Sequence, residues 1–187
     1  MSDGENDNWE RIWEARKLAL ENILGRSNEC VLHAAMPLQL GGEADVLVFS
    51  RGDNGIAYVT ADLTGELGES DADYELMICT PEESDWAPNI VSKLARYAID
   101  NPLGAGETMD IGSAVPAPSE ISALLFDTFA TTELLGREIE LRLCLGIASD
   151  ELDFVFAHGT DKLIQLLKAQ GVYPVTDLAR TSIALPS

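Results

Sequence analysis

The chain has 187 residues and a formal net charge of −20, from 32 Asp and Glu residues against 12 Lys and Arg residues. Hydrophobic residues make up 46% of the chain, the apolar share of a packed globule, which argues against intrinsic disorder. A chain of this length usually forms one domain with a sizeable core. Nucleic-acid binding needs clustered Lys and Arg, so the excess of acid excludes DNA or RNA as an expected partner.

The start of the chain, Met1 to Asp7, is polar and acidic, unlike the basic start and apolar core of a secretory signal peptide. No stretch approaches the roughly 18 uninterrupted apolar residues that a membrane span requires. The cysteines are odd in number, and both Cys79 and Cys144 lie within apolar runs. We therefore expect buried, reduced thiols, a cytoplasmic location and no membrane partner.

Residues Trp9 to Leu24 place apolar side chains three and four positions apart, which predicts an amphipathic helix that stops at Gly25. Two tryptophans on one face of this helix favour packing against the body of the protein over binding a partner. We assign residues 1–29 to an acidic N-terminal segment that contains this helix. Residues 30–187 are expected to form one folding unit.

Two β-rich segments, residues 46–49 and 56–60, flank the pair Asn54-Gly55. This pair supplies the positive φ angles of a tight turn, so we expect an antiparallel hairpin. A polar stretch follows, and residues 74–80 are expected to form a third strand.

A second helix is expected from about Trp86 to Asp100, with Ser84 or Asp85 as its cap. Its apolar positions recur with helical spacing and include Tyr97. The sequence after Asp100 is rich in Gly and Pro and predicts a loop.

The C-terminal half predicts strands at residues 122–129 and 138–147, the second with clear alternation of apolar and polar side chains. Helices are expected at residues 149–158 and 162–170. The tail, residues 172–185, is rich in β-forming residues, which favours an extended strand conformation. The order of elements predicts a single α+β, or mixed α/β, domain.

The sequence contains no recognisable constellation for catalysis. His33 and His158 are the only histidines, and neither lies in a metal-binding motif. Cys30 and His33 are three residues apart and could pair as nucleophile and base, but spacing alone favours ordinary packing or surface roles. We expect no catalytic site, no cofactor and no bound metal. A hydrolase with an unrecognised carboxylate site, such as Asp150 with Asp153, is the less favoured alternative.

Charge is unevenly placed along the chain, because no Lys or Arg occurs from Gly52 to Ser92. Such one-sided charge costs stability through self-repulsion, and a basic protein partner would offset that cost and be steered toward it. Solubility or adaptation to salt explains the excess equally well. The candidate contacts for a basic partner in this region are Glu66, Glu69, Asp71, Asp73, Glu82, Glu83 and Asp85.

A series of short motifs follows in order along residues 30–185: Gly41-Gly42-Glu43-Ala44-Asp45, Tyr74-Glu75-Leu76-Met77, Leu94-Ala95-Arg96-Tyr97, Gly136-Arg137-Glu138 and Tyr173-Pro174-Val175-Thr176-Asp177. Together they resemble the suppressor-of-fused domain family. The resemblance implies a single mixed α/β domain, with a mostly antiparallel or mixed sheet packed by helices, that binds proteins and catalyses nothing.

The chain is similar to the bacterial, single-domain members of this family, which are commonly immunity proteins that neutralise a toxin. The resemblance therefore implies a cognate toxin, expected to be basic, as the partner. Eukaryotic members hold a partner segment as an added strand, and Tyr97 and Glu107 match positions that contact it. Tyr97 also lies on the apolar stripe of its helix, so a core position competes with this role. A regulatory or scaffold protein without a toxin partner is the alternative.

Overall fold

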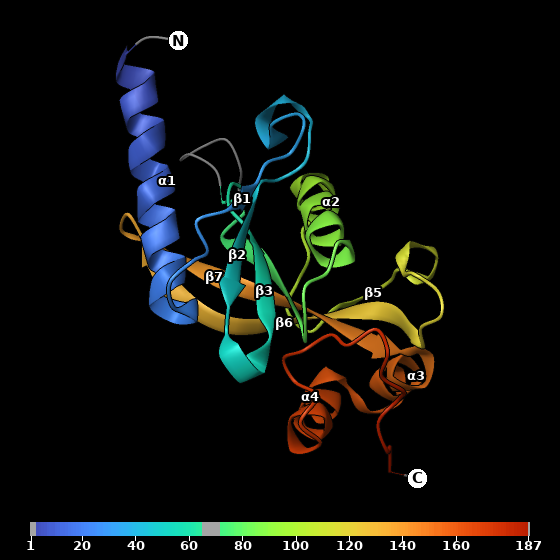
Figure 1. Ribbon diagram of the computed structural model, residues 1–187. Coiled ribbons are helices and arrows are strands. Elements are labelled where there is room, and N and C mark those ends of the chain that lie inside the picture. The colour runs from blue at the N-terminus through green and yellow to red at the C-terminus, as the bar shows by residue number, and fades with distance from the viewer. Residues whose placement is uncertain (1–2, 65–71, 187) are drawn as a thin grey trace.

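The computed structural model describes residues 3–64 and 72–186. In this part of the chain, seven strands form one sheet in the order β1-β2-β3-β4-β7-β6-β5, and four α-helices cover its two faces (Figure 1). The pairs at both ends of the sheet are antiparallel, and β4 and β7 in the middle are parallel. The predicted α+β domain with a mixed sheet is confirmed.

The strands are β1 (Val31–Leu32), β2 (Val46–Ser50), β3 (Ile56–Thr60), β4 (Tyr74–Thr80), β5 (Thr108–Asp110), β6 (Ile121–Leu134) and β7 (Arg137–Ala148). The helices are α1 (Asp3–Leu24), α2 (Trp86–Asp100), α3 (Ser149–His158) and α4 (Thr160–Ala169), with short 3-10 turns η1 (Leu38–Leu40), η2 (Gly52–Asn54) and η3 (Gly112–Ala114).

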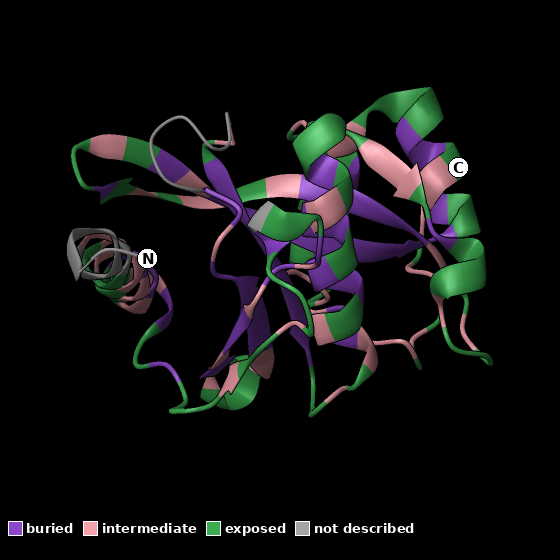
Figure 2. Cartoon of the chain, turned by 90° about the horizontal axis from the view of Figure 1, so that it is seen from above, coloured by how far each residue is buried: buried purple, intermediate pink, exposed green. Residues whose placement is uncertain are grey.

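The sheet separates two hydrophobic cores, because successive side chains of a strand point to opposite faces. On one face, α2 packs over alternate residues such as Tyr58 and Leu76. On the other face, α1, α3 and α4 pack over the intervening residues such as Val59 and Met77. Every residue of β4 is buried in consequence. Figure 2 shows this arrangement, with buried residues gathered in the central strands and exposed residues on the outer sides of the helices and in the loops.

The hairpin of β2 and β3 forms as predicted, with Leu47 opposite Val59, but its turn differs from the prediction. The chain makes a 3-10 turn over Gly52–Asn54, and the positive φ angles belong to Gly52 and Gly55. Asn54 is therefore not in the left-handed conformation that a two-residue Asn-Gly turn requires. A Cβ on Gly55 would lie 2.0 Å from the carbonyl oxygen of Thr80, so close backbone approach as well as φ demands glycine here.

Helix α1 begins earlier than predicted and packs against the core through Trp13, Leu20 and Leu24. The side chain of Trp9 lies outside the described residues. Arg16, on the inward side of α1, is 4% exposed and forms an ion pair with Glu75 of β4, whose side chain is fully buried. The sequence pattern identified the inward face of this helix, on which Arg16 lies, but gave no sign of its ion pair with Glu75.

The tail after α4 is not the strand that its β-forming residues predict. A single parallel bridge joins Val175 to Cys79 at the end of β4. The adjacent Thr176 is buried, its backbone N–H donates to the carbonyl oxygen of Cys79, and its hydroxyl accepts the N–H of Gly146 in β7. The tail thus fills the gap where β4 and β7 separate. One bridge and the hydrogen bonds of Thr176 hold the tail in this gap, in place of the continuous β-ladder that a strand would make.

Helix capping follows the prediction in part. Asp85 precedes α2, but its side chain makes no capping bond, and the hydroxyl of Ser84 accepts the N–H of Ala87 at 3.1 Å. Helix α3 begins at Ser149 as predicted, Ala148 is its N-cap residue, and Glu151 closes its first turn by accepting the N–H of Ala148 at 2.8 Å.

Candidate functional site

A shallow groove of about 350 Å³ runs between α2 and the segment that contains β5 and η3. Its apolar lining comes from α2 and from β5 with the residue after it, and the lining side chains include Ile90, Leu94, Met109 and Ile111. Tyr97 lies at this groove and is 47% exposed. Tyr97 therefore does not take the core position that its place on the apolar stripe allowed. Its neighbours Leu94 and Ala98 are the residues of α2 that point into the core.

Strand β5 places the groove at an end of the sheet. It pairs with β6 on one side, with Met109 opposite Leu124, and is the last strand in the order. A terminal strand presents backbone N–H and C=O groups along its outer edge, to which an extended segment of another chain can add.

Glu107 and Asp110 take different positions around this strand. Glu107 is exposed, and its carboxylate accepts the backbone N–H of Gly104 at 2.8 Å, which closes the loop before β5. Asp110 lines the groove together with Tyr97 and Lys93. The acid that shares the groove with the tyrosine is thus Asp110, although the sequence resemblance pointed to Glu107.

The other candidate contacts lie elsewhere. Glu82, Glu83 and Asp85 are exposed in the connection from β4 to α2, and Asp73 is exposed just before β4. Glu66, Glu69 and Asp71 lie outside the described residues. Tyr97 is twelve positions beyond Asp85 on α2, which corresponds to roughly 18 Å along a helix. The structure therefore divides the predicted contacts between two ends of α2.

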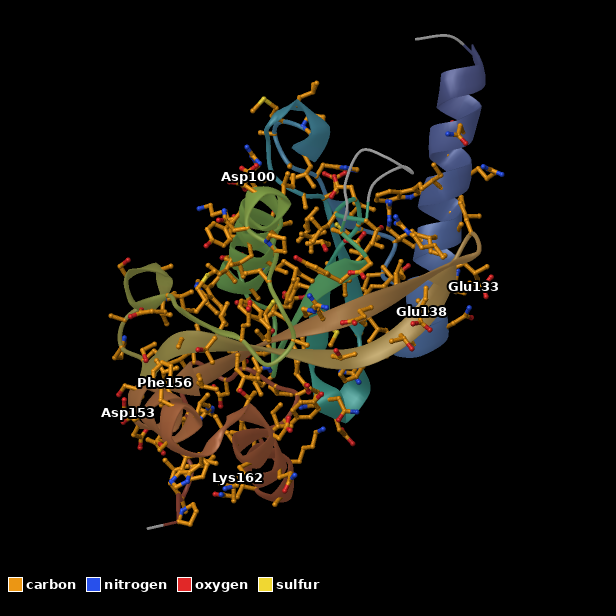
Figure 3. The ribbon with its side chains drawn as sticks, turned by 180° about the vertical axis from the view of Figure 1, so that it is seen from behind. Asp100, Glu133, Glu138, Asp153, Phe156 and Lys162 are labelled. Atoms are coloured by element: carbon orange, nitrogen blue, oxygen red, sulfur yellow. The ribbon has the colours of Figure 1, made fainter. Side chains whose placement is uncertain are left out.

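Negative charge is spread over several further elements (Figure 3). Asp100 ends α2, Glu133 and Glu138 face each other across the β6–β7 hairpin, and Asp153 is exposed on α3. An exposed aromatic side chain, Phe156, also projects from α3 and is 74% exposed. Acidity is thus a property of much of the described surface and does not by itself mark one site.

Cys30 and His33, the residues considered for catalysis, do not form a catalytic site. Cys30 is exposed and contacts the carbonyl oxygen of Val31, whereas Nδ1 of His33 lies 2.7 Å from Oδ2 of Asp45. No described hydrogen bond joins Cys30 to His33. The described residues contain no group of three or more His, Cys, Asp or Glu side chains that could hold a metal ion.

The two other cysteines behave as predicted from their apolar surroundings. Cys79 and Cys144 are both fully buried, and burial raises the pKa of each thiol, that of Cys144 to about 12. Such thiols are protonated and unreactive at neutral pH. Among the described helices, none is both long enough and apolar enough to cross a membrane.

The buried carboxylate of Glu75 lies close to a second, partly buried carboxylate, that of Asp62. Glu75 accepts hydrogen bonds from Thr60 Oγ1 at 2.5 Å and from both the N–H and the hydroxyl of Thr64, in addition to its ion pair with Arg16. Asp62 lies nearby with a buried Oδ1 that has no described partner. Burial, and then the charges of Glu75 and Asp45, raise the pKa of Asp62 to about 7.

Part of the groove was missed by the sequence analysis. The apolar residues Met109 and Ile111 fall in a region predicted as loop, because β5 is three residues long and acquires its strand conformation by pairing with β6. The alternation of Met109 and Ile111 around an acid was the available signal, but three residues are too short for a periodicity argument.

The fold is similar to that of several solved structures. A chain of the Sufu–Fu complex crystal structure matches with a TM-score of 0.72 at 14% identity, covering 91% of each chain. A SUFU homolog from Neisseria gonorrhoeae matches with a TM-score of 0.71 at 16% identity, covering 94% of this chain and 98% of that one. Drosophila Suppressor of Fused matches with a TM-score of 0.56 at 12% identity, over 76% of this chain and 39% of that one.

Identities this low establish the likeness of fold alone. None of the curated proteins compared with the sequence matches it significantly. The model of the suppressor of fused protein family, by contrast, matches residues 43–181, which is well over half of the chain. The chain therefore belongs to the suppressor of fused protein (SUFU) family.

Proposed function

We propose that this protein is a non-enzymatic protein-binding domain that receives a partner segment in the groove between α2 and β5. The observation that carries the proposal is the position of Tyr97, a half-exposed aromatic residue beside apolar side chains and the outer edge of a terminal strand. Backbone hydrogen bonds to β5 would supply affinity, and the groove would select side chains. Among the similar structures, one is of a complex, that of Sufu with Fu.

We further propose that the partner is a basic toxin and that the protein acts in the cytoplasm as its immunity protein, blocking the toxin by occlusion. The net charge of −20 supports a basic partner, since opposite charge accelerates encounter and excludes acidic competitors. The dispersed acids on α2, α3 and the β6–β7 hairpin suit long-range steering, which requires summed charge and no single patch.

The test is co-expression with the product of the neighbouring gene, followed by a growth assay and a pull-down. Growth rescue and a stable complex are expected, and the association rate should fall as salt is added. If neither rescue nor complex is observed, the toxin partner is wrong. A complex whose association rate does not depend on salt contradicts the electrostatic part alone.

The groove is tested separately by Tyr97→Ala, which removes the exposed ring without opening a core cavity. Aromatic residues central to interfaces contribute about 2 kcal/mol or more, so we expect about thirtyfold weaker binding of the partner. The matched control is Leu18→Ala, an exposed apolar residue on α1, which lies over the opposite face of the sheet. Equal loss in both variants, or no loss in Tyr97→Ala, would place the partner elsewhere.

A further inference from the structure

A second groove, of about 490 Å³, lies at the other end of the sheet, and we name it the β1–β3 groove. It lies on the sheet face that α2 covers, between side chains of β1, β2 and β3 and the residues at the start of that helix. Val48 and Ile56 are only partly covered by the core on this face, and Leu32 of β1 is 38% exposed. The floor of the groove therefore carries these apolar side chains, together with the polar Asn28 and Ser50, and is open to a ligand.

One wall of the β1–β3 groove is acidic. Glu83 and Asp85, both exposed, line it from the turn before α2. Neither side chain takes part in any ion pair among the described residues, and Asp85 does not cap the helix, since Ser84 performs that role. The fold thus holds two carboxylates beside the exposed apolar side chains of Leu32, Val48 and Ile56, and no described ion pair uses them.

No basic residue lines the groove, and the sequence has none from Gly52 to Ser92. A ligand that complements this surface has an apolar side chain for the floor and cationic side chains beside it. Because β1 is the terminal strand, an extended segment has room to lie along it. A peptide segment meets these conditions, since alternate side chains of an extended chain point to opposite sides.

We propose that the β1–β3 groove is a second docking surface, which binds an extended segment of a partner protein in which Lys or Arg flanks an apolar residue. It is separate from the groove at Tyr97, since the two share no lining residue and lie beside opposite ends of the sheet. The proposal does not depend on the identity of the toxin. It gives a binding role to Glu83 and Asp85, which do not line the groove between α2 and β5.

Cys30 provides the readout, because it lines the groove and is exposed, while Cys79 and Cys144 are fully buried. The rate of its alkylation by uncharged N-ethylmaleimide is measured with increasing amounts of the synthetic peptide Lys-Leu-Lys-Val-Lys-Leu-Lys. At about four times its Kd the peptide should slow the reaction about fivefold, since only the unoccupied groove reacts. The peptide Glu-Leu-Glu-Val-Glu-Leu-Glu should give no protection.

Variants decide whether the effect belongs to this groove. Glu83→Gln with Asp85→Asn should abolish protection by the basic peptide. The matched control, Glu133→Gln with Glu138→Gln, removes the same charge at the β6–β7 hairpin and should keep it. Continued protection of the buried thiols shows that each variant is folded.

Three results would overturn the proposal: no protection by the basic peptide, protection by the acidic peptide, or equal loss in both double variants. Tyr97→Ala should leave the protection of Cys30 unchanged. A failure of partner binding at the α2–β5 groove and a failure of this second surface are therefore read from different measurements.

Discussion

The ion pair between Arg16 and Glu75 offers the sharpest test of how α1 is held. The two side chains are 5% and 0% exposed, and Nε of Arg16 lies 3.2 Å from Oε1 of Glu75. Arg16 also donates to Thr64 Oγ1 at 3.0 Å and to the carbonyl oxygen of Ala61. The substitution Arg16→Met keeps much of the side-chain volume and removes the charge and these donors.

The cost of that substitution follows from the carboxylate that remains. Removing one partner of a buried ion pair typically costs about 3 to 5 kcal/mol, because the other charge stays buried and uncompensated. Glu75 keeps its hydrogen bonds from Thr60 and Thr64, so we expect the lower end, about 3 kcal/mol. For a domain of this size that is a fall of roughly 6 to 12 °C in Tm.

Urea unfolding followed by circular dichroism measures this loss, and tryptophan fluorescence, which sums Trp9, Trp13 and Trp86, gives a second signal. The matched control is Arg11→Met on the exposed side of the same helix, which should change the free energy of unfolding by less than about 0.5 kcal/mol. The double variant Arg16→Met with Glu75→Gln should cost less than the sum of the single variants. A loss below about 1 kcal/mol in Arg16→Met, or strict additivity, would refute the reasoning.

Further predictions concern a buried acid and the C-terminal tail. Burial and neighbouring carboxylates raise the pKa of Asp62 to about 7, so the folded state keeps a proton that the unfolded chain releases near pH 4. The free energy of unfolding therefore falls as pH rises from about 4 to about 7, and Asp62→Asn should gain about 2 to 4 kcal/mol over the parent across that range in urea titrations; a constant difference contradicts this. Gly146→Ala places a Cβ 2.5 Å from Cγ2 of Thr176 and should cost about 1 to 3 kcal/mol in thermal unfolding, while adding Thr176→Ser should recover part of it; no recovery would show that the clash is elsewhere. Arg180→Met leaves the fully buried Glu151 without its cation, so limited proteolysis should cut the tail sooner, and unaltered cleavage would argue against the anchor.

The sequence predicted those parts of the fold that carry a strong local signal. Helix α2 has helical spacing, β7 alternates, and the β2–β3 pair is rich in β-forming residues on both sides of a turn. Each lies within a residue or two of its predicted range. Strand β6 is longer than predicted, because its outer half is paired with β7 but only partly buried and so carries no apolar signal. Propensity misled in the tail, where β-forming residues make isolated bonds to Cys79 and Gly146.

The candidate site was predictable only in pieces. Tyr97 was found through resemblance, and its exposure depends on how α2 rotates over the sheet, which periodicity leaves open by about one position. Charge along the chain suggested one acidic surface, whereas acids are spread over several elements of the folded chain, and Asp85 and Tyr97, the second of which the resemblance suggested, lie at different ends of α2. Residues close in sequence share a surface only when the element between them is short, and α2 is 15 residues long.

The tail that fills the gap between β4 and β7 has a consequence for how the protein is made. Val175 and Thr176 supply bonds to Cys79 and Gly146 that no earlier segment of the described chain supplies. Until these residues have been synthesised, the carbonyl oxygen of Cys79 and the N–H of Gly146 lack these hydrogen-bond partners. We therefore expect the domain to complete its fold only after residue 180 has left the ribosome. A partner that binds the incomplete sheet would do so during translation.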